Sequence, residues 1–187
     1  QEYKVCVVFI NGEYWGIYNI REKFNEHYIQ QHHKVDKDSV TVMKHRNSLR
    51  IGKYLNYDDV VSFISKTDFS DTNNIDSLNK LIDINNYLDY NIAETYFANT
   101  DAGGNIRYWR TWKENDRWKW LMFDTDFGFG MDGKTAYNKN TVHDFTNKSN
   151  EIWPIPAWST LFIRKLLEND SIKEVYIRKF TTFLSTI

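Results

Sequence analysis

The sequence contains two neighbouring segments, DAGGNIRYW at 101–109 and WKWLMFDTDFGFG at 118–130, that are rich in aromatic residues and end in acidic ones. Around the polar tip at 113–117, this composition predicts a β-hairpin. With the turn centred between Glu114 and Asn115, Asn105 is predicted to lie opposite Asp124, with their Cβ atoms about 5 Å apart. The hairpin would therefore carry an amide and a carboxylate side by side at one end.

Two further carboxylates are predicted to join this end of the hairpin. Side chains alternate along a strand, so Asp126 returns to the face of Asp124 if the chain stays extended. Asp101 precedes Asn105 in the connecting loop and reaches the same neighbourhood. Converging carboxylates repel one another unless a cation compensates them, and Mg²⁺ or Mn²⁺ prefers such oxygen ligands. The pattern therefore indicates a metal site.

A second interpretation of the same acidic residues needs no metal. Asp101 would cap the loop, while Asp124 and Asp126 would pair with arginines. The arginines in question are Arg107, Arg110 and Arg117. The residues alone leave both interpretations open.

The start of the chain predicts another hairpin, from Tyr3 to Ile20, with its turn at Asn11-Gly12. A regular register would place Val7 opposite Gly16. Both faces of this hairpin are apolar, so we expect it to be sandwiched between other layers of the fold.

The rest of the chain predicts helices and a further strand, giving an α+β fold of antiparallel hairpins packed with helices. Helices are expected at 22–32, 58–66, 83–99, 157–167 and 171–184, a strand at 40–43, and polar loops at 68–74 and 131–151.

Composition excludes several classes of function. The 187 residues carry a net charge of -1, which gives no broad electrostatic footprint for nucleic acid. No apolar stretch is long enough for a membrane-spanning segment. The single cysteine, Cys6, excludes an internal disulfide, and the histidines match no zinc-binding spacing.

Five segments, in order along the chain, resemble the spore coat protein H (CotH) kinase family. They are Asn11-Gly12-Glu13-Tyr14-Trp15-Gly16-Ile17-Tyr18, Arg21-Glu22-Lys23, Asn99-Thr100-Asp101, Asn105-Ile106-Arg107-Tyr108-Trp109 and Phe123-Asp124-Thr125-Asp126-Phe127-Gly128-Phe129-Gly130. Each segment alone is a weak signal, but their shared order makes chance a poor explanation.

This resemblance implies an atypical protein kinase that uses ATP with Mg²⁺ or Mn²⁺ to phosphorylate Ser or Thr hydroxyls of secreted or cell-surface proteins. By position, Asp101 resembles the catalytic aspartate and Asn105 the metal-binding asparagine that follows it. Asp126 resembles the metal-binding aspartate of an Asp-Phe-Gly motif, and Asp124 its acidic companion, as a second metal ligand or a structural partner. Glu22 is assigned a positioning role. The family also implies an extracytoplasmic or cell-surface location.

The resemblance further implies a single kinase-like domain fragment over residues 1–187. Residues 1–45 would be the hairpin-containing part of the nucleotide lobe, and 46–187 the catalytic part. Family members begin earlier, with a basic segment for the nucleotide phosphates, so we expect a partial protein-kinase-like fold lacking this segment, and poor ATP binding by the chain alone.

One departure from the family pattern concerns the loop after Asp101. Relatives carry Trp-Pro-Gly-Asn-Asn there, whereas this chain has Ala102-Gly103-Gly104-Asn105, which is one residue shorter. A loop with two glycines would have to absorb the difference.

Two alternative functions remain open at this point. The chain could be a catalytically dead pseudokinase that acts as a scaffold, or a carbohydrate-binding module with a glycan stacked on exposed tryptophans. Trp109, Trp112, Trp118 and Trp120 crowd the second hairpin, where core packing is the favoured use. Trp153 and Trp158 are the better candidates for exposure.

Overall fold

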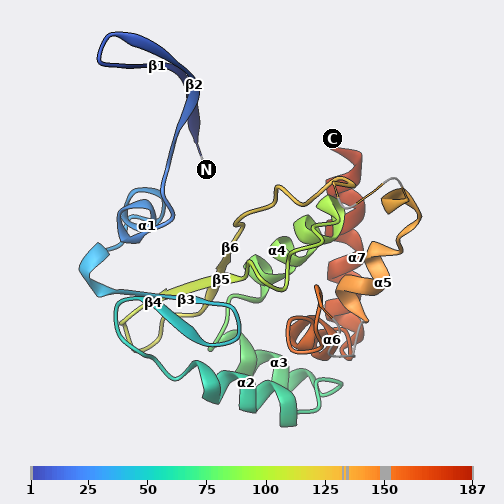
Figure 1. Cartoon of the computed structure of the whole chain (residues 1–187). Helices are drawn as coiled ribbons and strands as arrows, with labels where there is room; N and C mark the ends of the chain where they lie inside the picture. Colours follow the sequence, from blue (N-terminus) through green and yellow to red (C-terminus); the bar gives the residue numbers. More distant parts are fainter. Residues whose placement is uncertain (1, 132, 134, 148–152, 187) are drawn as a thin grey trace.

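The computed structural model describes residues 2–131, 133, 135–147 and 153–186, and these form an α+β fold (Figure 1). The strands are β1 Tyr3–Ile10, β2 Glu13–Arg21, β3 Val40–Lys44, β4 Ser48–Ile51, β5 Arg107–Thr111 and β6 Lys119–Leu121. The helices are α1 Glu26–His33, α2 Tyr57–Lys66, α3 Thr72–Asn79, α4 Ile84–Phe97, α5 Thr141–Thr146, α6 Leu161–Leu166 and α7 Asp170–Ser185. Short 3₁₀ turns lie at Lys37–Ser39 and Ala136–Asn138.

The main sheet has four antiparallel strands in the order β4-β3-β5-β6. Strand β3 pairs with β5 along its whole length, from Val40 opposite Thr111 to Lys44 opposite Arg107. The expected division of the chain after residue 45 therefore falls between two strands of one sheet.

The second hairpin forms as predicted, but its predicted register is wrong by one residue. Arg107 pairs with Leu121, whereas the predicted pairing of Asn105 with Asp124 would have set it opposite Met122. The cause lies in the tip, where Asp116 Oδ2 accepts hydrogen bonds from the Thr111 backbone N–H at 2.7 Å and from its hydroxyl at 2.8 Å. This side-chain contact sets where the turn begins.

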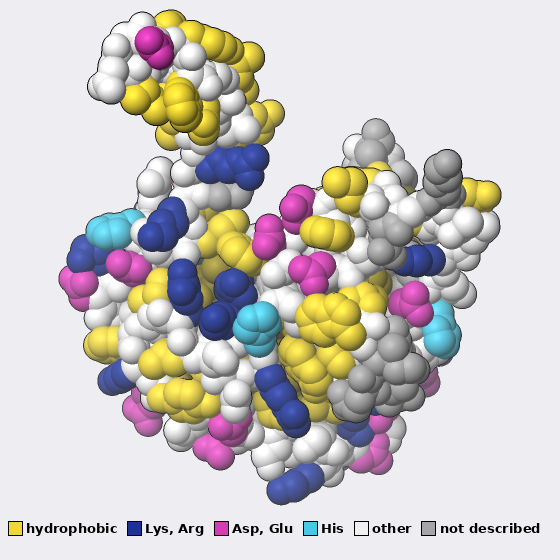
Figure 2. Space-filling view, viewed as in Figure 1, with side chains coloured by type: hydrophobic (Ala, Val, Ile, Leu, Met, Phe, Trp, Pro, Cys, Tyr) yellow, Lys and Arg dark blue, Asp and Glu magenta, His cyan; other side chains and the backbone are white. Residues whose placement is uncertain are grey.

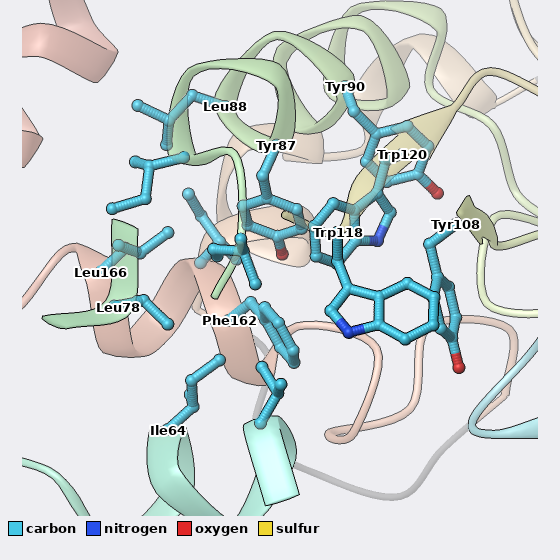
Figure 3. Close-up of a cluster of buried hydrophobic side chains, with 14 of the residues drawn as sticks. Ile64, Leu78, Tyr87, Leu88, Tyr90, Tyr108, Trp118, Trp120, Phe162 and Leu166 are labelled. Carbon is cyan, nitrogen blue, oxygen red and sulfur yellow. The ribbon is translucent and has the colours of Figure 1, made fainter. Parts of the chain in front are cut away.

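One face of the main sheet packs against α2, α4 and α6 through an aromatic core (Figure 3). Tyr108 of β5 stacks on Tyr57 of α2 with ring centroids 4.1 Å apart, and Trp118 meets Tyr57 edge-on at 5.2 Å. Phe162 of α6 packs against Trp120 at 5.4 Å. Burial of these large rings is a main contribution to the stability of the fold.

The opposite face of the sheet is covered by α1. Ile29 of α1 packs there with Val42, Trp109 and Leu121. Trp109 is 2% exposed, Trp118 is 1% exposed and Trp120 is 5% exposed, which confirms that these tryptophans serve the core. They therefore provide no exposed platform for a glycan, whereas Trp112 is 38% exposed and Trp153 is 59% exposed. The prediction of exposure is wrong for Trp158, which is partly buried and packs against the aromatic core.

The first hairpin, β1–β2, projects from the rest of the molecule, so the prediction that it is sandwiched between layers is wrong (Figures 1 and 2). Trp15 is 60% exposed and Ile17 is 69% exposed, although both are apolar. The expected register is also wrong, because a bulge between Val8 and Phe9 sets Val7 opposite Ile17 and Val8 opposite Gly16.

Two predicted loops contain helices. Helix α3 begins inside the segment 68–74 because the Asp71 side chain accepts a hydrogen bond from the Asn73 backbone N–H and caps it. Helix α5 lies inside the segment 131–151, of which residues 132, 134 and 148–151 are outside the described residues. Within the described chain, no helix combines the length and apolarity needed to cross a bilayer.

Candidate active site

Helix α4 ends at the segment that carries the predicted catalytic residues. Asp83 caps its start by accepting a hydrogen bond from the Asn86 backbone N–H, as its position predicts. Ala98 ends the helix in the left-handed conformation, with a φ of 51°, which turns the chain back toward the sheet. The expected helix boundary near Asn99 is therefore confirmed to within two residues.

Residues 101–105 form a compact turn rather than an open loop. The Gly104 N–H donates to the Asp101 carbonyl at 3.0 Å, and the Asn105 N–H donates to the Ala102 carbonyl at 3.2 Å. A Cβ on Gly103 would collide with the carbonyl oxygen of Pro154. Glycine is therefore required because another backbone segment packs directly against this turn.

The shortened turn brings Asp101 and Asn105 into direct contact. Asn105 Nδ2 donates to Asp101 Oδ2 at 2.9 Å and also approaches the Asp124 carbonyl oxygen at 3.4 Å. The missing residue relative to the family pattern therefore does not separate these side chains.

Asp124 and Asp126 reach the site by a route that the alternation argument did not predict. Strand β6 ends at Leu121, and Asp124 adopts the left-handed conformation with a φ of 58°, so the chain is not extended to Asp126. Two backbone hydrogen bonds tie the next segment to the end of α4: Thr100 N–H to the Phe127 carbonyl at 3.2 Å and Phe129 N–H to the Phe97 carbonyl at 2.6 Å.

The charges of the nearby acidic residues act on Asp124. Its pKa is raised by partial burial, and also by the negative charges of Asp126 and Asp101, while Arg107 opposes this change. The structure therefore brings Asp101, Asn105, Asp124 and Asp126 into one region through a turn, and their shared metal site stays a prediction.

Arg107 is a basic residue whose positive charge acts on Asp124. Its guanidinium lies over the Phe123 ring at 4.1 Å, and burial lowers its pKa, with a further contribution from the positive charge of Arg50. The other two arginines considered from the sequence are used elsewhere. Arg117 pairs with Asp83 at 3.1 Å, and Arg110 donates to the Lys113 carbonyl at 2.6 Å.

A cavity of about 540 Å³ lies beside the acidic cluster. Its lining includes Asp124 and Asp126 on one side and Arg21 and Phe24, which follow the first hairpin, on another. Charged residues of both signs lie in this part of the molecular surface (Figure 2). The cavity could therefore hold a polar ligand that carries both negative and positive charge, such as a phosphate with a bound metal ion.

The resemblance implies a divalent metal ion, which would need several side-chain ligands in this part of the molecule. Among the described residues, no three His, Cys, Asp or Glu side chains are close enough together to hold a metal ion. The oxygen donors present are the carboxylates of Asp124 and Asp126 and the amide oxygen of Asn105, whose nitrogen makes the hydrogen bond to Asp101. Oxygen donors of this kind are the chemical type that a hard divalent ion prefers, together with phosphate and water.

Glu22 lies at the base of the first hairpin. Its carboxylate accepts a hydrogen bond from the Glu2 backbone N–H at 2.8 Å, and its Oε1 lies 2.8 Å from His32 Nε2 of α1. These contacts join the hairpin to α1, and the positioning role assigned to Glu22 stays a prediction.

Sequence reasoning missed two buried polar residues beside the site, Glu94 and Asn99. Glu94 lies in α4 and is 1% exposed, and Asn99 Nδ2 donates to its Oε2 at 3.0 Å. Asn99 belongs to a segment that carries the family resemblance, which was a signal for it. Glu94 carried none, because one acidic residue in a helix is ordinarily read as solvent-facing.

The family model of CotH kinase proteins matches the chain over residues 1–187. The chain therefore belongs to the CotH kinase protein family, which confirms the resemblance seen in the sequence. No significant match was found among curated proteins or among solved structures.

Proposed function

We propose that this protein transfers the terminal phosphoryl group of ATP to Ser or Thr hydroxyls of secreted or cell-surface proteins. The observation that carries the proposal is the hydrogen bond between Asn105 Nδ2 and Asp101 Oδ2, because it joins the predicted base to the predicted metal-binding group. Membership of the CotH kinase family supports the use of ATP.

In the proposed reaction, Asp101 orients the acceptor hydroxyl and receives its proton as the new oxygen–phosphorus bond forms. The bond to the departing ADP oxygen breaks in the same step. Asn105, Asp124 and Asp126 would hold Mg²⁺ or Mn²⁺, which neutralises charge on the phosphate oxygens when bound. Arg21 and Arg107 supply positive charge beside the same cavity and would attract the nucleotide phosphates.

The test is metal-dependent transfer of labelled phosphate from ATP to Ser- and Thr-containing peptides. It should be run on the protein with and without any residues that its gene encodes before Gln1. Transfer should require Mg²⁺ or Mn²⁺ and fall by at least about a hundredfold in Asp126→Ala. A matched control is Asp89→Asn, because Asp89 is an α4 carboxylate that pairs with Lys179. Full transfer by Asp126→Ala would refute the assigned metal role.

A pseudokinase would be distinguished by nucleotide binding rather than by transfer. A ligand present at about a hundred times its dissociation constant stabilises a protein by about 2.7 kcal/mol, which a thermal shift readily detects. Absence of any shift with ATP and Mn²⁺, together with absence of transfer, would favour the scaffold function over the kinase.

A further inference from the structure

Glu94 is a buried carboxylate that the acidic cluster does not use. Its side chain is 1% exposed. Its Oε2 accepts the hydrogen bond from Asn99 Nδ2, and the Tyr90 hydroxyl acts on the same carboxylate. Burying a carboxylate away from water is unfavourable for folding even with such partners. Its presence in the core therefore calls for a reason other than stability.

Asn99 connects this carboxylate to the turn at 101–105. Asn99 is fully buried, and its Oδ1 accepts a hydrogen bond from the Asp101 backbone N–H at 3.2 Å. Because Asn99 Nδ2 donates to Glu94 and Asn99 Oδ1 accepts from Asp101, the Asn99 amide lies with its nitrogen toward α4 and its oxygen toward Asp101. Asp101 in turn accepts from Asn105. The contacts therefore run without a break from the helix to the base and the metal-binding amide.

We propose that Glu94 is a positioning residue, which acts through Asn99 to hold Asp101 and the turn at 101–105 in the geometry that phosphoryl transfer needs. The catalytic part of this inference rests on the proposed function, whereas the control of the turn by Glu94 does not. Glutamine at position 94 keeps a carbonyl oxygen that accepts from Asn99, and alanine removes it. A comparison of the two variants therefore shows whether the acceptor oxygen at position 94 holds the turn.

The first experiment measures amide hydrogen exchange of the turn in the chain itself. In Glu94→Ala, exchange at residues 101–105 should rise about tenfold, because one buried hydrogen bond no longer holds the turn. In Glu94→Gln it should stay within about twofold of the parent. The control is Tyr176→Phe, which removes a buried hydrogen bond of 2.8 Å to Asn91 of α4 and does not touch the turn.

Unchanged exchange of the turn in a folded Glu94→Ala would overturn the proposal. Equal loosening by Glu94→Gln and Glu94→Ala would also overturn it, because only the alanine variant lacks the acceptor. If Glu94→Ala does not fold, Asn99→Ala breaks the same connection from its other end, and it should loosen the turn to the same degree. A turn unaffected in that variant would refute the inference.

The second experiment measures kcat for phosphate transfer in the same variants. Asn99→Ala should lower kcat about tenfold, because the turn that carries Asp101 and Asn105 is no longer held in place. Glu94→Gln should keep kcat within about threefold of the parent. A parent protein without transfer activity would count against the proposed function alone, since the exchange experiment still decides whether Glu94 holds the turn.

Discussion

Glu94 gives a quantitative prediction about the pH dependence of folding stability. Burial is the main cause that raises its pKa, from an ordinary value of 4.5 to about 7, against the smaller opposing effects of the Asn99 amide and the Tyr90 hydroxyl. The small cavity beside it is lined by residues from α4, α5 and the segment before α6. Among these described lining residues, Glu94 is the one charged group. The carboxyl is therefore easier to protonate in the folded chain than in the unfolded one.

The sign and size of the effect follow from proton linkage. Between pH 4.5 and about 7 the folded chain binds a proton at Glu94 that the unfolded chain has lost, so the free energy of unfolding falls as pH rises. At about 1.4 kcal/mol per pH unit, the loss between these values amounts to about 3 kcal/mol. Glu94→Gln removes this term, since glutamine does not titrate.

Urea unfolding at pH 4 and at pH 8 measures the effect. The free energy of unfolding of Glu94→Gln minus that of the parent should increase by about 3 kcal/mol from pH 4 to pH 8, because all other titrating groups cancel in the difference. Glu174→Gln, at an exposed position of α7, is the matched control and should show almost no change. A difference for Glu94→Gln that is constant within about 0.5 kcal/mol would refute the buried, titrating carboxylate.

Two further predictions concern packing. Gly103→Ala should lower the free energy of unfolding by about 1–3 kcal/mol in the same urea assay, because its Cβ would collide with the Pro154 carbonyl oxygen, and an unchanged midpoint would contradict this contact. Acrylamide quenching of tryptophan fluorescence should fall clearly in Trp15→Phe, since Trp15 is 60% exposed. It should rise slightly in Trp118→Phe, since Trp118 is 1% exposed and its loss leaves a larger share of the emission to accessible tryptophans. Equal effects of the two variants would mean that the first hairpin is buried in solution.

The second hairpin shows how far local sequence reasoning reaches. Aromatic composition predicts its two strands, because such residues favour a pleated, buried surface, and the structure confirms both. Its register was missed because Asp116, a residue of the tip, hydrogen-bonds back to Thr111 through its side chain. A contact of this kind depends on the three-dimensional fit of the two side chains. The alternation of apolar and polar residues does not predict it.

The first hairpin shows a different limit. Its two apolar faces predict burial, since exposed apolar surface of this extent is unusual. The apolar residues of the hairpin predict that its faces favour contact with other apolar groups. They do not predict which segment makes that contact. In the structure Ile17 and Trp15 face outward, so the prediction of a strand pair holds while the prediction of its surroundings fails.

The sequence predicted that Asp101, Asn105, Asp124 and Asp126 would lie near one another, but not how the chain brings them together. The two halves of this site are held together by backbone hydrogen bonds between Thr100 and Phe127 and between Phe129 and Phe97, not by the carboxylates themselves. Partial burial is the main cause that raises the pKa of Asp124, and the negative charge of Asp126 adds to it, so this carboxylate opposes the folded arrangement to a small extent. Neutral substitutions at these positions should therefore leave the fold intact. The aspartates are thus more readily explained by a ligand they bind than by the fold they belong to.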